Sequence, residues 1–309
     1  MTFSILILAL LALAALIVLG AYICAQMVFA VHSVGEDVPR FPKGKQYLAL
    51  KKEILELIDK AAALPYEDVW QDSDGLRLHG KLYMQDKNAP VHILFHGYRS
   101  SALLDFGGGL KDIVDRGHNA LLVDQRAHAK SQGKYLSFGI KESRDCLRWI
   151  EYIIRELGSD TKIILEGVSM GGATVLMASG LELPDNVIGV LSDSAYSSPE
   201  MIIRHVMKKQ HYPQFIFPLI RLGGIIFGRF DICSESPLKA MENCKVPVFF
   251  IHGDDDRFVP YEMSLDTHAA CRTEKFFFTG KKAGHALSYL VDLEGYRKEH
   301  TKFMSCILK

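Results

Sequence analysis

The segment from Ile163 to Gly172, IILEGVSMGG, constrains the fold more than any other stretch of this 309-residue chain. Its short apolar run is typical of a buried strand, and the run ends in the pattern Gly-x-Ser-x-Gly. Small residues on both sides of a serine permit a sharp turn from a strand into a helix, which pushes the serine hydroxyl out at the end of the strand. The pattern therefore predicts that Ser169 is a nucleophile.

Other short apolar runs, rich in β-branched or aromatic residues, predict a sheet around this turn. The runs are VHILF (91–95), NALLVD (119–124), KIILEG (162–167), VIGVLSD (187–193), VPVFFIHG (246–253) and EKFFFTG (274–280). Helical segments intervene, most clearly Glu142 to Leu157, and this alternation is typical of a parallel sheet covered on both faces. Two alternating runs around Asp74-Gly75 predict an antiparallel hairpin. We expect an α/β fold in which this hairpin leads into a mostly parallel, doubly wound sheet.

Composition excludes several classes of protein. The 36 basic and 36 acidic residues balance to a net charge of +0, and without a long basic run we expect no nucleic-acid partner. The 6 Cys have no C-x-x-C spacing, which predicts reduced and mostly buried thiols. The glycines at 107–109 lack the rest of a dinucleotide or phosphate loop, and H-E-x-x-H does not occur. We therefore expect neither a metal nor another cofactor.

The N-terminus differs from the rest of the chain. Between Phe3 and Val31 there is no charged residue, and about 20 apolar helical residues suffice to cross a membrane. A cleavable signal peptide has a basic start and a shorter apolar core, whereas here no Lys or Arg precedes the run and the run is too long. A soluble helix of this length would carry a polar face. We expect an uncleaved single-pass membrane anchor over residues 1–35.

Basic residues follow the apolar run, and none precedes it. They are Arg40, Lys43, Lys45, Lys51 and Lys52. The positive-inside rule then predicts that the C-terminal bulk of the chain is cytoplasmic, where free cysteines also persist.

An amphipathic connector helix is predicted over residues 36–65, before a globular domain at 66–309. Its apolar residues recur at helical spacing and are Tyr47, Leu50, Ile54, Leu57 and Ile58, with Lys and Glu between them. Such a stripe packs on a core or lies on a membrane face, and the pattern leaves both open.

Residues capable of catalysis follow four of the predicted strands. Because open α/β sheets bind ligands at the carboxyl ends of their strands, these residues are expected to meet at one edge. They are His96-Gly97-Tyr98 after the first parallel strand, Ser169 after the third, the run HGDDD (252–256) and finally His285. The chain order Ser, Asp, His is that of a nucleophile on a strand-to-helix turn followed by its acid and its base.

These segments resemble the α/β-hydrolase superfamily, and within it the membrane-anchored serine hydrolases related to monoglyceride lipase and serine aminopeptidases. The resemblance runs from about residue 66 to the C-terminus and implies a helical lid insertion at about 197–237. It depends on FHGYRSS (95–101), DQRAHAKSQG (124–133), GVSMGG (167–172), HGDDDRFVP (252–260) and AGHALSY (283–289). One departure is Arg126-Ala-His128-Ala, where such families usually have Arg-Gly-His-Gly. The change puts the backbone geometry of this turn in question.

A serine hydroxyl needs a base that takes its proton during attack, and an imidazole that titrates near neutrality is suitable. His285 is the predicted base. The imidazole needs an acid that fixes its tautomer, and Asp254, Asp255 and Asp256 all compete for this role. The resemblance to HG-x-x-D-x-x-VP favours Asp256. Asp193, at the end of the strand after the turn helix, is the alternative acid.

Acyl transfer also requires donors for the developing oxyanion. The backbone N–H groups of Tyr98 and Met170 are the predicted donors, because one follows His96-Gly97 and the other opens the helix after Ser169. His96 and Asp124 are expected to shape loops and not to react.

The insertion contains HYPQFIFPLIRLGGIIFGRF, and its composition leaves two interpretations open. It is either a lid over an apolar acyl pocket or a helical cap packed on the core. The favoured function is a serine hydrolase that cleaves a carboxylic ester of a small-molecule or lipid-like acyl substrate through an acyl-enzyme. A peptidase or amidase on the same triad and a non-catalytic membrane-tethered scaffold remain alternatives. The oligomeric state stays open.

Overall fold

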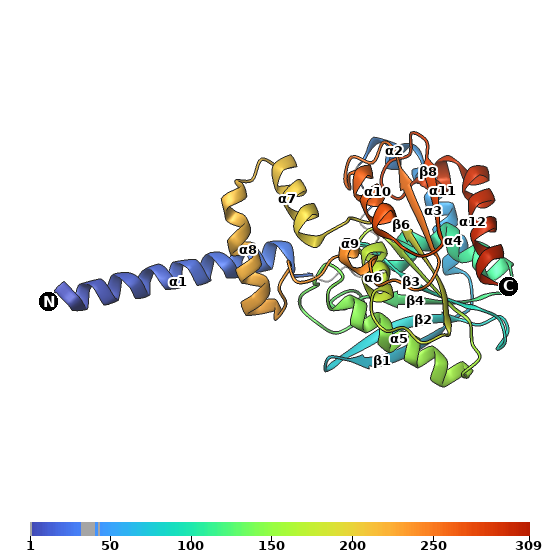
Figure 1. Cartoon of the computed structure of the whole chain (residues 1–309), viewed down its shortest axis with the longest axis horizontal. Coiled ribbons are helices and arrows are strands. Elements are labelled where there is room, and N and C mark those ends of the chain that lie inside the picture. Colours follow the sequence, from blue (N-terminus) through green and yellow to red (C-terminus); the bar gives the residue numbers. More distant parts are fainter. Residues whose placement is uncertain (1, 32–40, 43) are drawn as a thin grey trace.

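The computed structural model describes residues 2–31, 41–42 and 44–309. Within these residues the core is an eight-stranded sheet of order β1-β2-β4-β3-β5-β6-β7-β8, with helices on both faces (Figure 1). Strands β3 to β8 are parallel, and β2 is antiparallel to both of its neighbours. The strands are β1 (Glu67–Ser73), β2 (Leu76–Tyr83), β3 (Val91–Phe95), β4 (Asn119–Asp124), β5 (Ile163–Val168), β6 (Val187–Asp193), β7 (Val248–Gly253) and β8 (Lys275–Gly280).

The predicted fold class is confirmed. All six apolar runs are parallel strands, and the opening hairpin turns at Asp74 and Gly75, both of which have positive φ (51° and 72°). Two such residues suit the right-handed twist of the flanking strands. The chain passes from β3 outward to β4 and then back across β3 to β5, so the strand order reverses beside β3. A reversal of this kind opens a crevice at the carboxyl ends of the strands.

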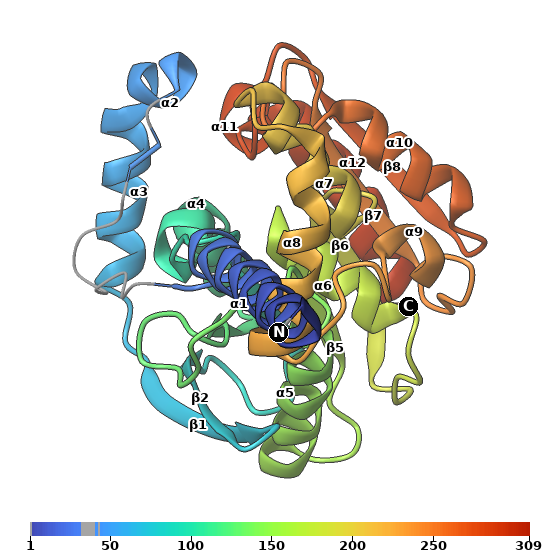
Figure 2. The same ribbon diagram turned by 90° about the vertical axis from the view of Figure 1, so that its left-hand side faces the viewer.

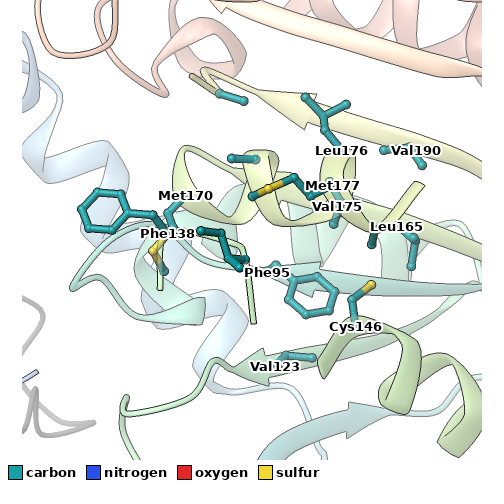
Figure 3. Close-up of a cluster of buried hydrophobic side chains, with 14 of the residues drawn as sticks. Phe95, Val123, Phe138, Cys146, Leu165, Met170, Val175, Leu176, Met177 and Val190 are labelled. Carbon is teal, nitrogen blue, oxygen red and sulfur yellow. The ribbon is translucent and has the colours of Figure 1, made fainter. Parts of the chain in front are cut away.

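Helices bury the two faces of the sheet in separate cores. Neighbouring residues of β3 divide between them, since Ile93 and Phe95 pack with α6 whereas Leu94 packs with α4. Figure 3 shows part of the first core, in which Phe95 and Leu165 lie near the side chains of α6. The helices of the domain are α3 (Lys51–Ala62), α4 (Ala102–Asp115), α5 (Glu142–Leu157), α6 (Met170–Ser179), α9 (Pro237–Ala240), α10 (Tyr261–Ala270), α11 (Ser288–Val291) and α12 (Leu293–Ile307).

Helix α1 (Thr2–Val28) projects away from the domain (Figure 1). From Phe3 to Val28 it is long and apolar enough to cross a membrane. Its residues 3–19 are exposed, whereas Ala21, Ala25 and Phe29 at and just beyond its C-terminal end are fully buried against the domain. The division at residues 35 and 65 stays a prediction. Of the basic residues that orient the anchor, Arg40 and Lys43 lie outside the described residues.

The predicted connector stripe forms α2 (Lys45–Ala49) and α3, which are separated at Leu50. Helix α3 ends at Ala62, three residues before the position expected from the sequence. It buries Ile54 and Ala61 and packs on α4, so its apolar face belongs to the domain. Of the two open interpretations of this stripe, the structure therefore favours packing on the core.

The segment between β6 and β7 forms a helical cap. It comprises α7 (Pro199–Lys209), the 3-10 turn η1 (Gln214–Ile216), α8 (Phe217–Gly223) and the π-helical turn η2 (Gly224–Gly228). Figure 2, which looks nearly along α1, shows α8 beside it, and α8 contacts α1 directly. The cap is thus placed between the sheet and the protruding part of α1.

Candidate active site

Ser169 occupies a strained turn between β5 and α6. Its φ and ψ are 56° and −113°, a backbone conformation that a residue with a side chain rarely adopts. Its neighbours must be small, because a Cβ on Gly167 would overlap the backbone of Gly171, and a Cβ on Gly171 would overlap the carbonyl oxygen of Phe95. These two positions therefore require glycine, and the turn presents the serine side chain at the carboxyl end of β5.

Asp256 and His285 lie together at the ends of β7 and β8. The Nδ1 atom of His285 is 2.7 Å from Oδ2 of Asp256, whose side chain is completely buried. Burial alone would lower the pKa of His285, but the carboxylate raises it above its usual value. Burial would likewise raise the pKa of Asp256, but His285 and His252 hold it well below its ordinary value. Asp256 is therefore a carboxylate at neutral pH.

Asp256 is held rigidly by further partners. Its Oδ1 accepts hydrogen bonds from the backbone N–H groups of Phe258 (2.7 Å) and Val259 (2.9 Å), and Nε2 of His252 lies 3.0 Å from Oδ2. A carboxylate with this many donors keeps both its charge and its orientation. Asp254, two residues earlier, instead accepts the backbone N–H of Lys282.

The alternative acid, Asp193, is buried beside this pair but does not bond to His285. Its side chain accepts a hydrogen bond from Ser194 Oγ, and its backbone oxygen accepts the N–H of Ser169. Burial raises the pKa of Asp193 to about 6. Asp193 therefore supports the turn through its backbone, while Asp256 is the carboxylate in contact with the imidazole.

Ser169 and His285 line one cavity of about 380 Å³ at the ends of the strands, together with Tyr98 and Phe258. Within the described residues no hydrogen bond joins the Ser169 hydroxyl to the imidazole. Such a contact is often long before a substrate binds. The ring of Phe258 packs against His285 at a centroid distance of 5.1 Å, with the two ring planes tilted by 59°.

The two predicted oxyanion donors flank the serine. Met170 is the first residue of α6, so its N–H has no partner inside the helix, and Tyr98 lies in the loop after β3. Neither amide donates a hydrogen bond within the described part of the chain. His96, which was expected to shape this loop, accepts the N–H of Gln125 at Nε2.

Asp105 was not predicted from the sequence, although it holds this loop. Its carboxylate accepts the N–H of Gly97 (2.6 Å) and the hydroxyl of Ser100 (2.6 Å), and burial raises its pKa. An acidic residue in the first turn of α4, where the helix dipole favours negative charge, was the available signal.

Gln46 and Tyr47 are two further supports that sequence reasoning missed. Tyr47 donates its hydroxyl to the backbone oxygen of His285 (2.5 Å), and the side chain of Gln46 accepts the N–H of Gly284 (2.6 Å). Both residues lie in α2, 238 residues before their partners. No local pattern in the sequence indicates contacts of this kind.

The departure Arg126-Ala-His128-Ala has a visible backbone consequence. Ala127 and Ala129 have φ of 65° and 44°, the left-handed region that favours glycine. The turn keeps its shape because Arg126 forms two hydrogen bonds to the buried carboxylate of Asp145 (2.7 and 2.6 Å). The alanines therefore adopt the backbone that glycines would take, with some strain.

A second, apolar pocket of about 560 Å³ meets the first at Ser169. Helix α1, the cap helices and the segment after Asp256 line it. We call it the apolar pocket. Ser169 therefore lies between a cavity with several polar groups and one with almost none. Among the described residues no group of three or more His, Cys, Asp or Glu could hold a metal ion.

Comparison with known proteins agrees with this architecture. The family model for the alpha/beta hydrolase fold matches residues 90–213. An esterase of Pyrococcus furiosus superposes with a TM-score of 0.64 over 81% of this chain and 94% of its own, at 22% identity. The chain has the α/β-hydrolase fold.

Two other proteins are similar to this α/β-hydrolase-fold chain. The acylaminoacyl peptidase of Pyrococcus horikoshii covers 82% of it with a TM-score of 0.59, using 43% of the peptidase, at 20% identity. The uncharacterized protein YqkD of Bacillus subtilis (strain 168) is 26% identical over 195 residues, which are 62% of this chain and 63% of YqkD. The match thus spans less than two thirds of that relative.

Proposed function

We propose that this protein is a serine hydrolase that cleaves a carboxylic ester through an acyl-enzyme. The observation that carries the proposal is the 2.7 Å contact between His285 and the buried carboxylate of Asp256, next to a serine on a strained turn in the same cavity. A serine, an imidazole and a buried carboxylate in this order are the elements of nucleophilic acyl transfer.

In the first half-reaction Oγ of Ser169 attacks the ester carbonyl carbon while Nε2 of His285 takes its proton. Asp256 keeps the proton of the imidazole on Nδ1, so that Nε2 is free to accept, and it stabilises the imidazolium. The carbonyl oxygen becomes an oxyanion between the N–H groups of Tyr98 and Met170. The imidazolium then returns its proton to the alcohol oxygen, and the bond from the acyl carbon to that oxygen breaks.

In the second half-reaction water replaces the alcohol. His285 takes a proton from water as the water oxygen attacks the acyl carbon, and it then protonates Oγ of Ser169 as the acid leaves. An amide would be cleaved by the same steps. Because the fold is similar to that of a peptidase, amide hydrolysis is the second candidate reaction and is included in the substrate panel. The apolar pocket beside Ser169 favours an ester with an apolar acyl group.

We further propose that α1 is retained as a single-pass anchor and that the domain is cytoplasmic. Phe29, just beyond the C-terminal end of α1, is fully buried and packs against Phe138 and Phe230, with ring centroids 6.1 and 5.0 Å apart. Cleavage of α1 as a signal sequence would expose these partners, which supports retention. Protease treatment of intact cells should leave the domain uncut until the membrane is permeabilised, and cutting before that step would refute the orientation.

A fluorophosphonate probe and a substrate panel test the chemistry. We expect the probe to label the purified full-length protein, Ser169→Ala to abolish labelling, and the surface change Ser159→Ala to leave it intact. Esters of small alcohols should be cleaved faster than the matched aminoacyl amides. Equal labelling of Ser169→Ala, or an unlabelled and inactive wild type, would defeat the enzymatic proposal and favour a scaffold.

A further inference from the structure

We infer that the C-terminal third of α1 is a wall of the active site, and that a long-chain ester lays its acyl chain along this helix. The inference rests on the proposed function and assigns the site a substrate class and an unexpected binding element. On this view the anchor has two parts. Residues 3–19 face the surroundings, and residues from Gly20 onward form part of the acyl pocket.

The first argument is the composition of the apolar pocket. On one side it is lined by residues of α1, namely Gly20, Ile23, Cys24, Met27 and Val28. Residues of the cap helices α7 and α8 also line it, and Ser169 lies at the junction with the polar cavity. The volume of about 560 Å³ is within the range of ligand pockets, ~300–1,000 Å³.

Two of the tyrosine hydroxyls in this pocket are already engaged. The hydroxyl of Tyr98 donates to the backbone oxygen of Val28 (2.9 Å), and that of Tyr196 donates to the backbone oxygen of Phe138 (3.0 Å). Beyond Ser169 the pocket therefore offers a ligand almost only apolar surface. Transfer of an alkyl chain from water to such a surface is favourable in free energy. Transfer of a peptide is unfavourable, because its amide groups lose their hydrogen bonds to water and find no partners in the pocket.

The second argument is the opening of the pocket. Ile23 and Met27 line it and yet remain 49% and 57% exposed, so the pocket is open where α1 leaves the domain. Large apolar side chains of the cap are also exposed near this opening, including Tyr212, which lines the pocket, and Phe215, which is 81% exposed. Apolar surface of this kind next to an apolar helix is suited to a membrane interface.

The length of α1 places the opening at that interface. The 17 exposed residues from Phe3 to Leu19 span about 26 Å at ~1.5 Å per residue, close to the ~30 Å of a bilayer core. Gly20 and Ile23, the first pocket residues, then lie at the membrane boundary. An acyl chain that leaves the bilayer beside α1 reaches Ser169 without crossing water.

The third argument is that the wall is fixed to the cap and to the loop after β3. A Cβ on Gly223 of α8 would overlap the backbone oxygen of Ala21, so the two helices cross closely through small residues. The guanidinium of Arg99 donates to the backbone oxygens of Met27 (2.8 Å) and Ala30 (2.7 Å), which satisfies carbonyls that a helix end leaves unpaired. Together with the hydrogen bond from Tyr98 to Val28, these contacts join the pocket wall to the loop that carries a proposed oxyanion donor.

A steric variant tests the inference on the full-length protein in lipid vesicles. Cys24→Trp should narrow the pocket, and Leu16→Trp is the matched control, since Leu16 lies on the same helix outside the pocket and is 65% exposed. We expect Cys24→Trp to lower the ratio of kcat/KM for a dodecanoate ester to that for an acetate ester by about tenfold or more, the scale of a filled apolar pocket. Leu16→Trp should leave this ratio unchanged.

Reversible modification of the Cys24 thiol in the wild type also tests whether the acyl chain lies along α1. Decyl methanethiosulfonate forms a disulfide with a thiol and releases methanesulfinate. It should suppress dodecanoate hydrolysis by the wild type more than acetate hydrolysis, and dithiothreitol should restore it. Cys24→Ser, which retains the other cysteines, should be insensitive to the reagent.

The outcomes separate the inference from the proposed function. A wild type that cleaves esters, together with a Cys24→Trp variant that is labelled at Ser169 and keeps the wild-type ratio, overturns the inference alone. If the fluorophosphonate probe does not label Cys24→Trp, the variant has lost its fold or its site, and the decyl methanethiosulfonate experiment decides. If that reagent inhibits dodecanoate hydrolysis by Cys24→Ser as strongly as by the wild type, the inference is overturned. A wild type that cleaves no ester and is not labelled defeats the proposed function, and the inference with it.

Discussion

Replacement of Asp256 by Asn is the most direct perturbation of the candidate site. The carboxylate is completely buried, lies 2.7 Å from His285 and accepts two backbone N–H groups. Asparagine has nearly the same shape, and its oxygen can keep the two backbone bonds. Its amide N–H then faces Nδ1 of His285, which must accept a hydrogen bond and so carries its proton on Nε2. In that tautomer the imidazole cannot take the proton of Ser169.

The expected loss of activity in Asp256→Asn has two causes, the loss of a negative charge beside the imidazolium and the wrong tautomer of His285. The attraction between a carboxylate and the imidazolium that forms during attack is about 4 kcal/mol at ~4 Å and an effective dielectric constant of ~20. This energy corresponds to about 1,000-fold in rate, since each ~1.36 kcal/mol is tenfold. The wrong tautomer adds to the loss, and about 10,000-fold is known for the corresponding change in another serine-hydrolase triad. We expect kcat for an acetate ester to fall by about 1,000- to 10,000-fold.

The pH profile gives an independent readout. Because Asp256 raises the pKa of His285, the wild-type kcat/KM should fall on the acid side with a midpoint above about 6.5, the usual histidine value. In Asp256→Asn burial still lowers the pKa of His285 and only the weaker effects of Asp193 and Asp105 raise it, so the midpoint should move to lower pH. Asp193→Asn is the matched control and should change kcat less than tenfold, since Asp193 does not contact the imidazole. A large loss in Asp193→Asn with a small loss in Asp256→Asn would refute the assignment.

Three further predictions concern stability. Ala129→Gly should raise the free energy of unfolding by up to about 1 kcal/mol, because relief of the left-handed strain at φ 44° exceeds the entropy gained by the unfolded chain; a denaturation midpoint below that of the wild type would contradict this. Gly171→Ala should prevent stable folding, since its Cβ overlaps the carbonyl of Phe95, and a cooperative wild-type-like melt would refute the steric argument. Asp193→Asn should stabilise the protein at pH 7 by up to about 3 kcal/mol. Burial raises the pKa of Asp193 from ~3.9 to about 6, so ionisation destabilises the fold progressively between these values. The gain should vanish below pH 4, and a gain independent of pH would contradict it.

The sheet was predictable because local sequence patterns indicate its strands and turns. The apolar runs of β3 and β4 match the observed strands residue for residue, and the run of β7 begins two residues early, at Val246, where Pro247 follows. Apolar runs flanked by turn residues indicate buried strands regardless of what they pack against. The turn at Ser169 has a local sequence pattern, although only Gly167 is required by backbone a few residues away, whereas Gly171 is required by the carbonyl oxygen of Phe95 on β3.

Supports that depend on contacts between distant segments were not predictable. Asp105 holds the loop after β3 from the first turn of α4, and a sequence pattern shows the acidic residue but not its partners. The burial of Ala21 and Ala25 was also missed, since uniform apolarity is compatible with lipid contact on every face of a helix. Close crossing of α1 and α8 needs small residues on both helices, which a pattern on either helix alone does not reveal.

Both helical segments before residue 66 contact loops of the candidate site. Helix α1 is joined to the loop of Tyr98, and α2 is joined to the loop of His285 through a 2.5 Å hydrogen bond from Tyr47. Tyr47→Phe removes only this hydroxyl, and a hydrogen bond contributes ~1 kcal/mol, so kcat/KM should fall about fivefold. Because a looser His285 is a weaker base for Ser169, fluorophosphonate labelling should slow equally, while Tyr66→Phe at the surface should leave both rates unchanged. Full activity of Tyr47→Phe, or of residues 66–309 alone, would show instead that the hydrolase domain holds its imidazole without help from the preceding helices.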